Sequence, residues 1–521
     1  DFYTARQATL YRCLADLSAG VRSECATGAG LAAFRDLAAS GIPEIMVDTA
    51  YAWARILDLQ GNGPAARRQM SGLFEDLHIY RAGLNGVLGG WYWTNKAEVF
   101  NAFVDLMRKA GGEEMLLALE RVRRLERATG SQSGNEQLRS DIARLATTTE
   151  QTARSGLVHQ VNAGLEDLRA AGGSEWRAPD TSLLRQWLGR LDATESVLAF
   201  HFTGNAVYAL PADRNGVGLV RIGNAAMIRR QLETLRDQLG SGAGGAPTET
   251  LDALGSALLK PLAGRMKDRI YLLPAGPLNG LPLDAFRLGK QYLARDHQVI
   301  NLGSLASLGL SSAMSADYRD RVFLAGNPQS GQDLFSYGVS TSTEIAAVRD
   351  LFVGGGLHIV QGVALHQDEF SDSRFENAAL VHLAMPGRVD LAYPERSRLL
   401  LSGSRDDPSA EFLTAAELRA YPLNADLAVL SATAFAEQSA SPLDSRLGLI
   451  SELQEAGASR VVATLWPAGD RETAAFMSDF YTALAAEPDV ATALFETRRT
   501  RIESENAANF GSWAGFQLFI R

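Results

Sequence analysis

The side chains that most often carry protein chemistry are few in this sequence of 521 residues. Its only cysteines are Cys13 and Cys25, so residues 26–521 contain no thiol. Two cysteines are too few for a zinc ribbon or a Cys-ligated cluster, and the seven histidines show no metal-ligand spacing. We therefore expect neither a metal site nor a cofactor. Cys13 and Cys25 either form one disulfide across a short helical hairpin or remain two buried thiols, and we favour the buried thiols.

Hydroxyl groups are the remaining candidate nucleophiles, and Ser431 and Thr433 follow a short apolar run. A hydroxyl becomes a good nucleophile only when a base lies beside it. A histidine, His382, lies on another apolar run, which Pro386 directly follows. His382 is four residues before that strand end, or about 13 Å back along the strand. We therefore expect His382 to have a structural role inside a sheet. We expect Ser431 to hydrogen-bond to the backbone at the end of its strand.

An acidic residue next to an aromatic one is a candidate for binding rather than for catalysis. Asp470 comes shortly after Trp466 and Pro467, at the end of a further apolar run. A carboxylate held at a strand end can bind an arginine guanidinium through charge-assisted hydrogen bonds. The same carboxylate can cap the helix that we expect from Arg471, because aspartate is a favoured N-cap residue. Both interpretations remain open.

The elements that would position these residues begin near Arg319, where short apolar runs alternate with amphipathic helices. This alternation predicts a mainly parallel sheet covered by helices on both faces, with ligands bound at the carboxyl ends of the strands. We expect strands at 322–325, 357–361, 380–385, 427–432 and 461–465. We expect helices at 342–352, 414–421, 444–456, 471–485 and 490–504.

A second stretch with α/β character precedes this one. We expect strands at 196–203, 206–210, 218–222, 269–274 and 299–302, with helices at 225–239 and 251–263. Glycine, serine and proline mark its boundary with the preceding region near 172–181.

The first 175 residues predict helices only. One pair is expected at 43–60 and 64–81, and a second pair at 91–110 and 113–128. Trp53 belongs to an apolar stripe with helical spacing. Each pair resembles a tetratricopeptide (TPR) unit, so we expect a TPR-like helical arm at 1–175 that ends in a polar bridging helix near 137–171. Such an arm either binds a peptide or partner protein in its groove or only supports the next domain.

The composition narrows the classes of function. A net charge of −10 at pH 7 argues against a nucleic-acid-binding surface. No run approaches the ~20 apolar residues of a membrane span. We slightly favour a cytoplasmic location, and an exported or periplasmic one if a signal peptide preceded Asp1 and the two cysteines form a disulfide.

Five segments carry a family resemblance. In chain order they are Arg269–Phe286, Val381–Gly387, Leu427–Thr433, Gly457–Asp470 and Trp513–Leu518. Together they resemble the CHAT domain, a caspase- and separase-like peptidase domain often found behind TPR helices. The resemblance covers residues 180–521 and implies a caspase-like α/β domain with an N-terminal half at 180–318 and a caspase-like half at 319–521. We therefore expect a bacterial protein with a helical arm followed by an α/β domain.

The resemblance also assigns the catalytic positions. Members of the family cleave peptides with a His-Cys dyad, and here those positions are Pro386 and Thr433, which are 47 residues apart. Proline cannot accept a proton, and threonine is a poor nucleophile without a base. The resemblance further assigns Asp470, with Trp466 beside it, to a pocket for a basic side chain.

These observations predict a catalytically inactive CHAT-domain pseudopeptidase that acts as a scaffold or regulatory partner. Its partner would be a protein or peptide, bound through the helical arm and the degenerate active-site groove, and an active CHAT relative is one candidate. The alternative is a hydrolase of unrecognised chemistry that uses the hydroxyl of Ser431 or Thr433.

Overall fold

The structure is a computed structural model of the 521-residue chain. It describes residues 2–21, 25, 28–40, 43–83, 96–127, 137, 140–141, 144, 148, 151–172, 179–240, 246–310, 312–328, 341–352, 356–389, 397–402, 412–431, 433–435, 448–466, 470–504 and 510–521. The chain divides into two compact units, Asp1–Thr181 and Ser182–Arg521.

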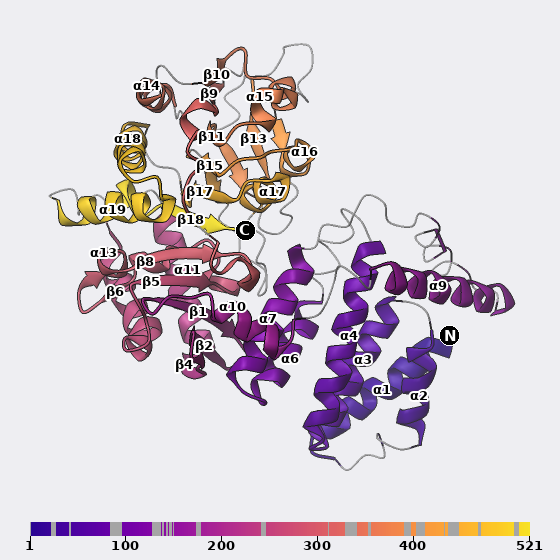
Figure 1. The fold of residues 1–521 in the computed structure, drawn as a ribbon. Helices are drawn as coiled ribbons and strands as arrows, with labels where there is room; N and C mark the ends of the chain where they lie inside the picture. The colour runs from indigo at the N-terminus through magenta and orange to yellow at the C-terminus, as the bar shows by residue number, and fades with distance from the viewer. Residues whose placement is uncertain are drawn as a thin grey trace. The chain divides into compact units, whose positions relative to one another are not determined.

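The described part of the first unit is entirely helical (Figure 1). Its helices are α1 (Phe2–Ser18), α2 (Ala29–Ala38), α3 (Pro43–Leu59), α4 (Gly63–Gly83), α6 (Ala97–Arg108), α7 (Gly112–Arg127) and α9 (Gln151–Gly172). The helices predicted at 43–60, 64–81 and 113–128 are confirmed. The helix predicted from residue 91 is observed from Ala97, because residues 91–95 lie outside the described residues.

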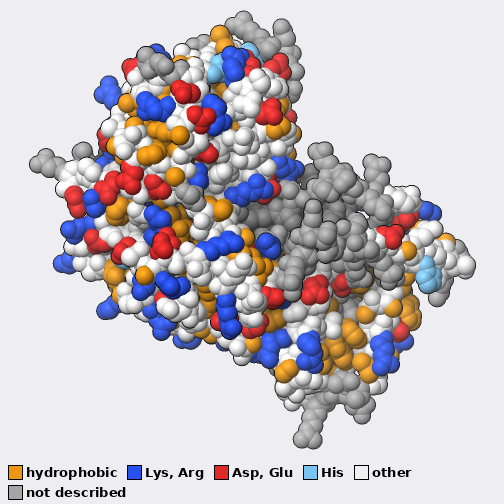
Figure 2. All heavy atoms as spheres, in the orientation of Figure 1, with side chains coloured by type: hydrophobic (Ala, Val, Ile, Leu, Met, Phe, Trp, Pro, Cys, Tyr) orange, Lys and Arg blue, Asp and Glu red, His pale blue; other side chains and the backbone are white. Residues whose placement is uncertain are grey.

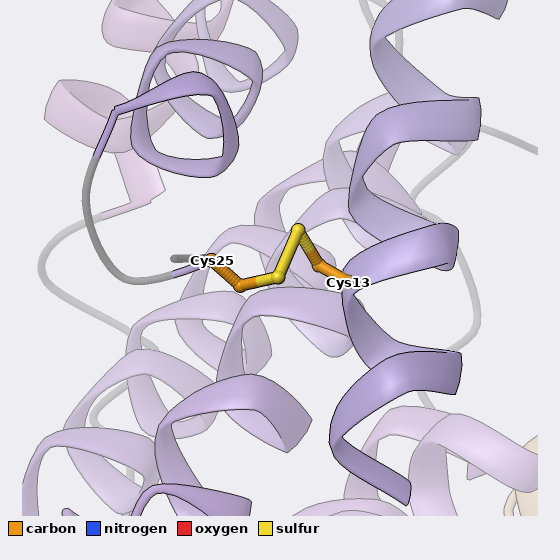
Figure 3. Close-up of a disulfide and its surroundings, with 2 residues drawn as sticks. All are labelled: Cys13 and Cys25. Carbon is orange, nitrogen blue, oxygen red and sulfur yellow. A yellow bond between two sulfur atoms is a disulfide. The ribbon is translucent and has the colours of Figure 1, made fainter. Parts of the chain in front are cut away.

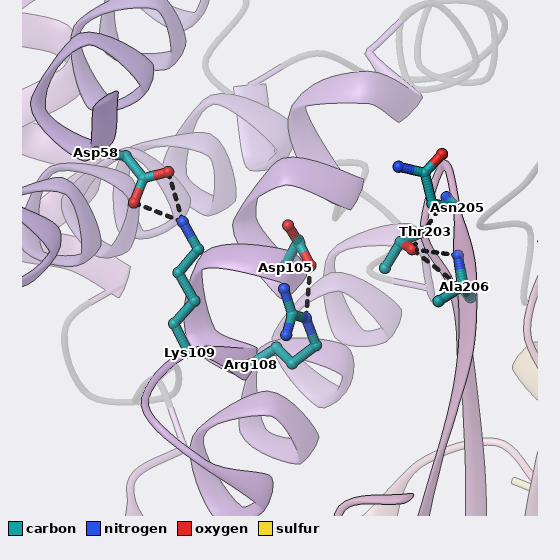
Figure 4. A network of polar contacts seen from close by, with 7 residues as sticks. All are labelled: Asp58, Asp105, Arg108, Lys109, Thr203, Asn205 and Ala206. Carbon is teal, nitrogen blue, oxygen red and sulfur yellow. Dashed lines mark hydrogen bonds and ion pairs between the residues drawn. The ribbon is translucent and has the colours of Figure 1, made fainter. Parts of the chain in front are cut away.

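Two ion pairs tie α3 to the region of α6. Near one end of α3, the Lys96 ammonium is 2.5 Å from Asp48. Near the other end, the Lys109 ammonium lies 2.7 Å from both carboxylate oxygens of Asp58 (Figure 4).

Figure 4 also labels Thr203 of the second unit, whose hydroxyl accepts from the backbone N–H of Ala206 and closes the turn between two strands.

The two cysteines form a disulfide, which corrects the expectation of two buried thiols. Cys13 lies on α1 and Cys25 in the loop before α2, with Cα atoms 5.4 Å apart (Figure 3). Both side chains are buried in the core of the arm together with Leu37 and Trp53. Gly30 allows this loop to approach α2, because a Cβ atom there would overlap the carbonyl of Cys25. The two cysteines pair because this packing brings them together. Their spacing in the sequence does not specify that packing.

The second unit is built on a twelve-stranded sheet within the described residues. Its strand order is β10-β9-β11-β15-β17-β18-β8-β5-β1-β2-β3, with β4 paired to β2. These strands are β1 (Glu195–Phe202), β2 (Ala206–Asp213), β3 (Gly216–Val217), β4 (Val220–Asn224), β5 (Arg269–Leu273), β8 (Gln298–Leu302), β9 (Val322–Pro328), β10 (Leu357–Gly362), β11 (Leu380–Ala384), β15 (Leu427–Leu430), β17 (Arg460–Thr464) and β18 (Phe516–Ile520).

Most of this sheet is parallel, as predicted. The run from β10 to β17 is parallel, and so is the run from β18 through β8 and β5 to β1. The strand β18 pairs antiparallel to β17 and parallel to β8, so it joins the two runs. The expected fold class, a helical region followed by an α/β domain, is therefore confirmed.

Helices cover both faces of the sheet (Figure 1). They are α10 (Thr181–Leu188), α11 (Ala225–Gly240), α12 (Thr248–Leu254), α13 (Leu293–Asp296), α14 (Ser342–Leu351), α15 (Ser373–Glu376), α16 (Ala415–Ala420), α17 (Leu449–Ala456), α18 (Asp470–Ala486) and α19 (Val490–Glu503). Successive side chains of β11 point to opposite faces of the sheet, and their contacts show which helices cover each face. Val381 and Leu383 join the buried cluster that contains Leu418 of α16 and Leu453 of α17. His382, between them, contacts α14 and α18 on the other face.

A small second sheet was not predicted. Its order is β14-β13-β12-β16, with β12 (Gly387–Val389), β13 (Arg398–Leu400), β14 (Phe412–Thr414) and β16 (Thr433–Phe435). Each of these strands has only three residues, which is too short for an apolar alternation to stand out. This sheet continues from the carboxyl ends of β11 and β15, where the candidate catalytic positions lie.

Candidate functional site

The candidate site lies at the carboxyl ends of three neighbouring parallel strands, β11, β15 and β17. Pro386 follows β11, Ser431 and Thr433 follow β15, and Trp466 follows β17. Side chains after adjacent parallel strands converge on one edge of a sheet, which is where open α/β folds bind ligands.

Pro386 and Thr433 lie within one residue of register on neighbouring strands. In the main sheet Leu383 of β11 pairs with Leu430 of β15. Beyond those strand ends the register shifts by one residue, and Gly387 of β12 pairs with Thr433 of β16. The carbonyl of Pro386 accepts a hydrogen bond from the backbone N–H of Leu400, 2.8 Å away. The backbone thus brings the two positions together, although the side chain of Thr433 lies outside the described residues.

The carboxyl end of β11 is held in place by Thr341, which precedes α14, and by the neighbouring strand β9. The hydroxyl of Thr341 donates to the carbonyl of Ala384 at 2.7 Å and accepts from the backbone N–H of Asn327 at 2.8 Å. Gly326 lies close to the same strand end, since a Cβ atom there would come within 2.6 Å of the Ala384 carbonyl. These contacts fix the backbone that leads into Pro386.

His382 is fully buried, as expected for a structural residue. Its Nδ1 lies 2.8 Å from the hydroxyl of Tyr481 on α18, and its Nε2 lies 3.1 Å from a carboxylate oxygen of Glu344 on α14. Burial, together with the nearby Glu344, raises the pKa of Tyr481 well above its usual value, so the phenol keeps its proton and can donate it to Nδ1. The Nε2–H group then donates to Glu344. Both nitrogens are engaged inside the protein, so neither is available as a base for Ser431 or Thr433.

Ser431 departs from its expected role. Its side chain is buried, but its hydroxyl has no hydrogen-bond partner among the described residues, which corrects the expected bond to the backbone. Only its backbone N–H is engaged, 3.3 Å from the carbonyl of Leu383. A buried hydroxyl without a partner is energetically costly.

Trp466 and Asp470 flank the end of β17. The ring of Trp466 is half-buried and stacks on Phe510 with 5.8 Å between ring centroids and 7° between planes. Gly515 lies beneath it, because a Cβ atom there would come within 3.2 Å of the indole. Asp470 is the first residue of α18, as predicted for an acid at that helix end, but its side chain lies outside the described residues. The choice between pocket and helix cap therefore stays open.

The sequence did not reveal the partners that hold the motifs in place. Asp284, in the segment 269–286, forms an ion pair of 2.5 Å with Arg498 of α19 and accepts a hydrogen bond from Gln517 of β18 at 2.9 Å. Arg236 of α11 donates to the carbonyl of Pro277 in the same segment at 3.1 Å. The sequence gives one indication of such contacts, which is a charged residue inside a mostly apolar segment. A charged residue in that setting usually needs a partner.

The chemistry open to this edge is narrow. Proline offers no proton acceptor, and the one histidine on the strand is engaged elsewhere. Within the described residues, no group of three or more His, Cys, Asp or Glu could hold a metal ion. None of the described helices is long and apolar enough to cross a membrane.

Comparison with known proteins supplies the family context. A family model described as the CHAT domain matches residues 248–520. The match begins at the start of α12, so it leaves out β1 to β4, which nevertheless pair into the same sheet. No curated protein matches this chain.

Several solved structures resemble it at low sequence identity. The separase–securin complex of Saccharomyces cerevisiae has a TM-score of 0.43 and 8% identity, and the alignment covers 94% of this chain and 45% of that chain. The Arg-specific cysteine proteinase gingipain R has a TM-score of 0.31 and 9% identity, with 57% and 74% covered. A complex of pro- and mature domains from Porphyromonas gingivalis gives 0.31 and 10%, with 57% and 75% covered. The chain spans under half the length of the separase chain it matches.

Proposed function

This chain belongs to the CHAT domain family, and we propose that it is a catalytically inactive member that binds a protein or peptide at its degenerate active-site edge. The proposal assigns the lost dyad to Pro386 and Thr433. The observation that carries it is the register of β12 and β16, which sets Gly387 opposite Thr433 and Pro386 directly beside that pair.

Two features of this edge support inactivity. A cysteine peptidase needs a thiolate and a base within hydrogen-bond reach of each other. Residues 26–521 contain no cysteine, and both nitrogens of His382 are engaged by Tyr481 and Glu344. The edge therefore has no thiolate to attack a peptide bond, and His382 is not available as the base that would accept a proton.

Recognition is the part of the site that we propose to be retained. Asp470 begins α18, four residues after the half-buried Trp466, and a carboxylate together with an aromatic ring suits the cationic side chain of arginine. The residue replaced by proline makes and breaks bonds, whereas Asp470 would only hold a side chain. The edge would then hold a basic peptide without cutting it, and an active CHAT relative could supply or receive that peptide.

Rebuilding the dyad tests whether the edge is a degenerate peptidase site. We expect native protein to leave fluorogenic peptides with Arg, Lys or Asp before the scissile bond uncut. The variant Pro386→His, Thr433→Cys should be labelled by thiol-directed inhibitors at the thiol introduced on β16, because the backbone register already sets the two positions together. The matched control is Ser459→Cys with Pro386→His, which places an exposed thiol before the amino end of β17, at the other end of the parallel strands from Pro386.

Cleavage by the native protein that disappears in Ser431→Ala or Thr433→Ala would overturn the proposal. Equal labelling of the rebuilt site and of the Ser459→Cys control would refute the assignment of the dyad positions. Calorimetry with Arg-containing peptides against native protein and Asp470→Asn tests recognition separately. Asparagine keeps a capping hydrogen bond but loses the charge, so equal binding by both would mean that Asp470 only caps α18.

A second candidate function is hydrolysis by a hydroxyl nucleophile. The observation that favours it is the hydroxyl of Ser431, which is buried at the site without a partner. A substrate that supplied a hydrogen-bond acceptor would satisfy it. This candidate needs a base that the described residues do not place beside Ser431, so broad ester-hydrolysis screens with native protein and Ser431→Ala should give equal rates.

The disulfide bears on where such a protein works. Disulfides persist in oxidising compartments and are rare in the cytoplasm. The Cys13–Cys25 bond therefore favours an exported location over the cytoplasmic one that we preferred from the sequence. Trapping of free thiols in the native cell tests this, since a cytoplasmic protein would be alkylated at both cysteines without prior reduction.

A further inference from the structure

A groove runs along the arm between α3 and α4, with α2 at one side. It encloses about 590 Å³ and is lined on the α2 and α3 side by Phe34, Met46, Trp53 and Leu57. The rings of Phe34 and Trp53 stack with centroids 4.8 Å apart, which makes this wall rigid. Hydrophobic side chains gather on the surface of the helical unit in the space-filling view (Figure 2). The volume lies within the range of binding sites in proteins.

The two long walls of the groove are straight and equal in length. On α3 the lining runs from Met46 to Leu57, and on α4 it runs from Ala65 to Asp76. Each stripe spans twelve residues of helix, and its first and last residues are about 16 Å apart at the α-helical rise. This is the length of a three-turn helix, and helix-in-groove binding uses apolar anchors at i, i+3, i+4 and i+7 over that distance.

A glycine keeps the α4 wall open. Gly72 lies in the interior of α4 and lines the groove, and a Cβ atom there would meet nothing within 4 Å. Glycine inside a helix is unfavourable relative to alanine, and it is usually explained by a close contact. Packing within the arm does not require it here. The missing side chain instead leaves room for an atom from outside the chain.

The groove has opposite charges at its two ends. Because α3 and α4 are joined by the short turn at residues 60–62, Leu57 and Arg68 lie towards one end, while Met46 and Asp76 lie towards the other. Arg68 is exposed, and its guanidinium forms no ion pair or hydrogen bond with another described residue. Arg68 and Asp76 are separated by about 12 Å of helix, so a ligand that carries one acidic and one basic residue about two turns apart would match both.

We propose that this groove binds one amphipathic helix of a protein partner, about three turns long, with an acidic residue towards Arg68 and a basic residue towards Asp76. The inference rests on the proposed role in protein binding and specifies the partner class for the arm. It concerns residues of the first unit only. Its test is therefore independent of the peptidase assays on Pro386 and Thr433.

The test uses three fluorescein-labelled twelve-residue peptides with the same apolar face. One has an acidic residue at one end and a basic residue at the other, the second has acids at both ends, and the third has bases at both ends. Fluorescence anisotropy with the full chain should show that the mixed-charge peptide binds at least about tenfold more tightly than either other peptide. Its affinity should fall as salt is raised.

Three variants locate the binding. Gly72→Leu fills the groove from α4 and should weaken binding of the mixed-charge peptide at least about tenfold. The matched control is Gly156→Leu, because Gly156 is likewise helical and has nothing within 4 Å of a Cβ atom but does not line the groove, so this variant should bind the peptide as native protein does. Arg68→Glu makes both ends acidic, so this variant should prefer the peptide with bases at both ends. That reversal would not follow from a loss of structure.

Absence of binding by all three peptides at concentrations on the order of 1 mM would overturn the proposal. So would equal losses in Gly72→Leu and Gly156→Leu, because the peptides would then bind elsewhere or respond to stability. Concentration-dependent self-association that Gly72→Leu abolishes would replace the partner helix with a second copy of this chain.

Discussion

The ion pair between Asp284 and Arg498 should be among the most sensitive points of the second unit. The side chain of Asp284 is fully buried and that of Arg498 is 3% exposed, with 2.5 Å between their charged atoms. Asp284→Asn keeps the size of the side chain and an acceptor for Gln517, so it removes little except the charge. Arg498 is then left buried without its counter-ion. Removal of one partner from a buried pair costs about 3–5 kcal/mol, and we expect a loss of that size in the free energy of unfolding.

Hydrogen exchange in residues 516–520 is the appropriate readout, because β18 belongs to the second unit and unfolding of the arm does not enter. The control is Asp317→Asn, which breaks the exposed pair with Arg321 and should leave exchange in β18 unchanged. A double variant, Asp284→Leu with Arg498→Met, removes both charges and should be less destabilised than Asp284→Asn alone. A loss below about 1 kcal/mol in Asp284→Asn would refute this reasoning. So would a double variant that is destabilised as much as the single variants Asp284→Leu and Arg498→Met added together.

Three further outcomes are expected. Reduction of the Cys13–Cys25 bond, which closes a loop with a sequence separation of 12, should lower the free energy of unfolding of the arm by about 3 kcal/mol, measured by urea unfolding with and without reductant. Burial, with Glu195 nearby, raises the pKa of Tyr271 to about 12, so the unfolded chain loses this proton first and stability should fall between about pH 10 and 12. Tyr271→Phe should make that fall shallower in urea midpoints taken across this range. Gly457→Ala should prevent accumulation of folded protein, because its Cβ would overlap the carbonyl of Leu423 at a φ of +131°, whereas Gly264→Ala, with open space around it, should fold normally.

The main strands could be predicted because each is a short, continuous apolar run. Val322–Ala325 and Leu427–Leu430 are buried on both faces, so their composition alone marks them as central strands. The strand β18 was harder to predict. The segment 513–518 was noted only as a family motif, and its pairing with both β17 and β8 depends on residues more than fifty positions away. Local pattern carries no information on such pairing.

At the candidate site, the sequence located the positions but not their environment. The resemblance to the CHAT domain implied that Pro386 and Thr433 follow successive strands, and the register of β12 and β16 has this arrangement. The buried position of His382 followed from its place within an apolar run. Its partners, Glu344 and Tyr481, come from helices 38 and 99 residues away in the chain, which only the packing of the sheet brings together. The free hydroxyl of Ser431 contradicted expectation for the same reason, since hydrogen bonding depends on what the neighbouring chain presents.

The position of β18 has a consequence for the order of events during synthesis. It is the last of the labelled strands in the chain, yet it lies in the middle of the sheet between β17 and β8. Until residues 516–520 have left the ribosome, β17 in one half-sheet and β8 in the other lack the strand that pairs with them, and both are mostly buried in the folded chain. Such edges pair readily with other chains. The nascent protein therefore carries an open β8 edge once residue 302 has been made and an open β17 edge once residue 464 has been made, and one five-residue strand closes both.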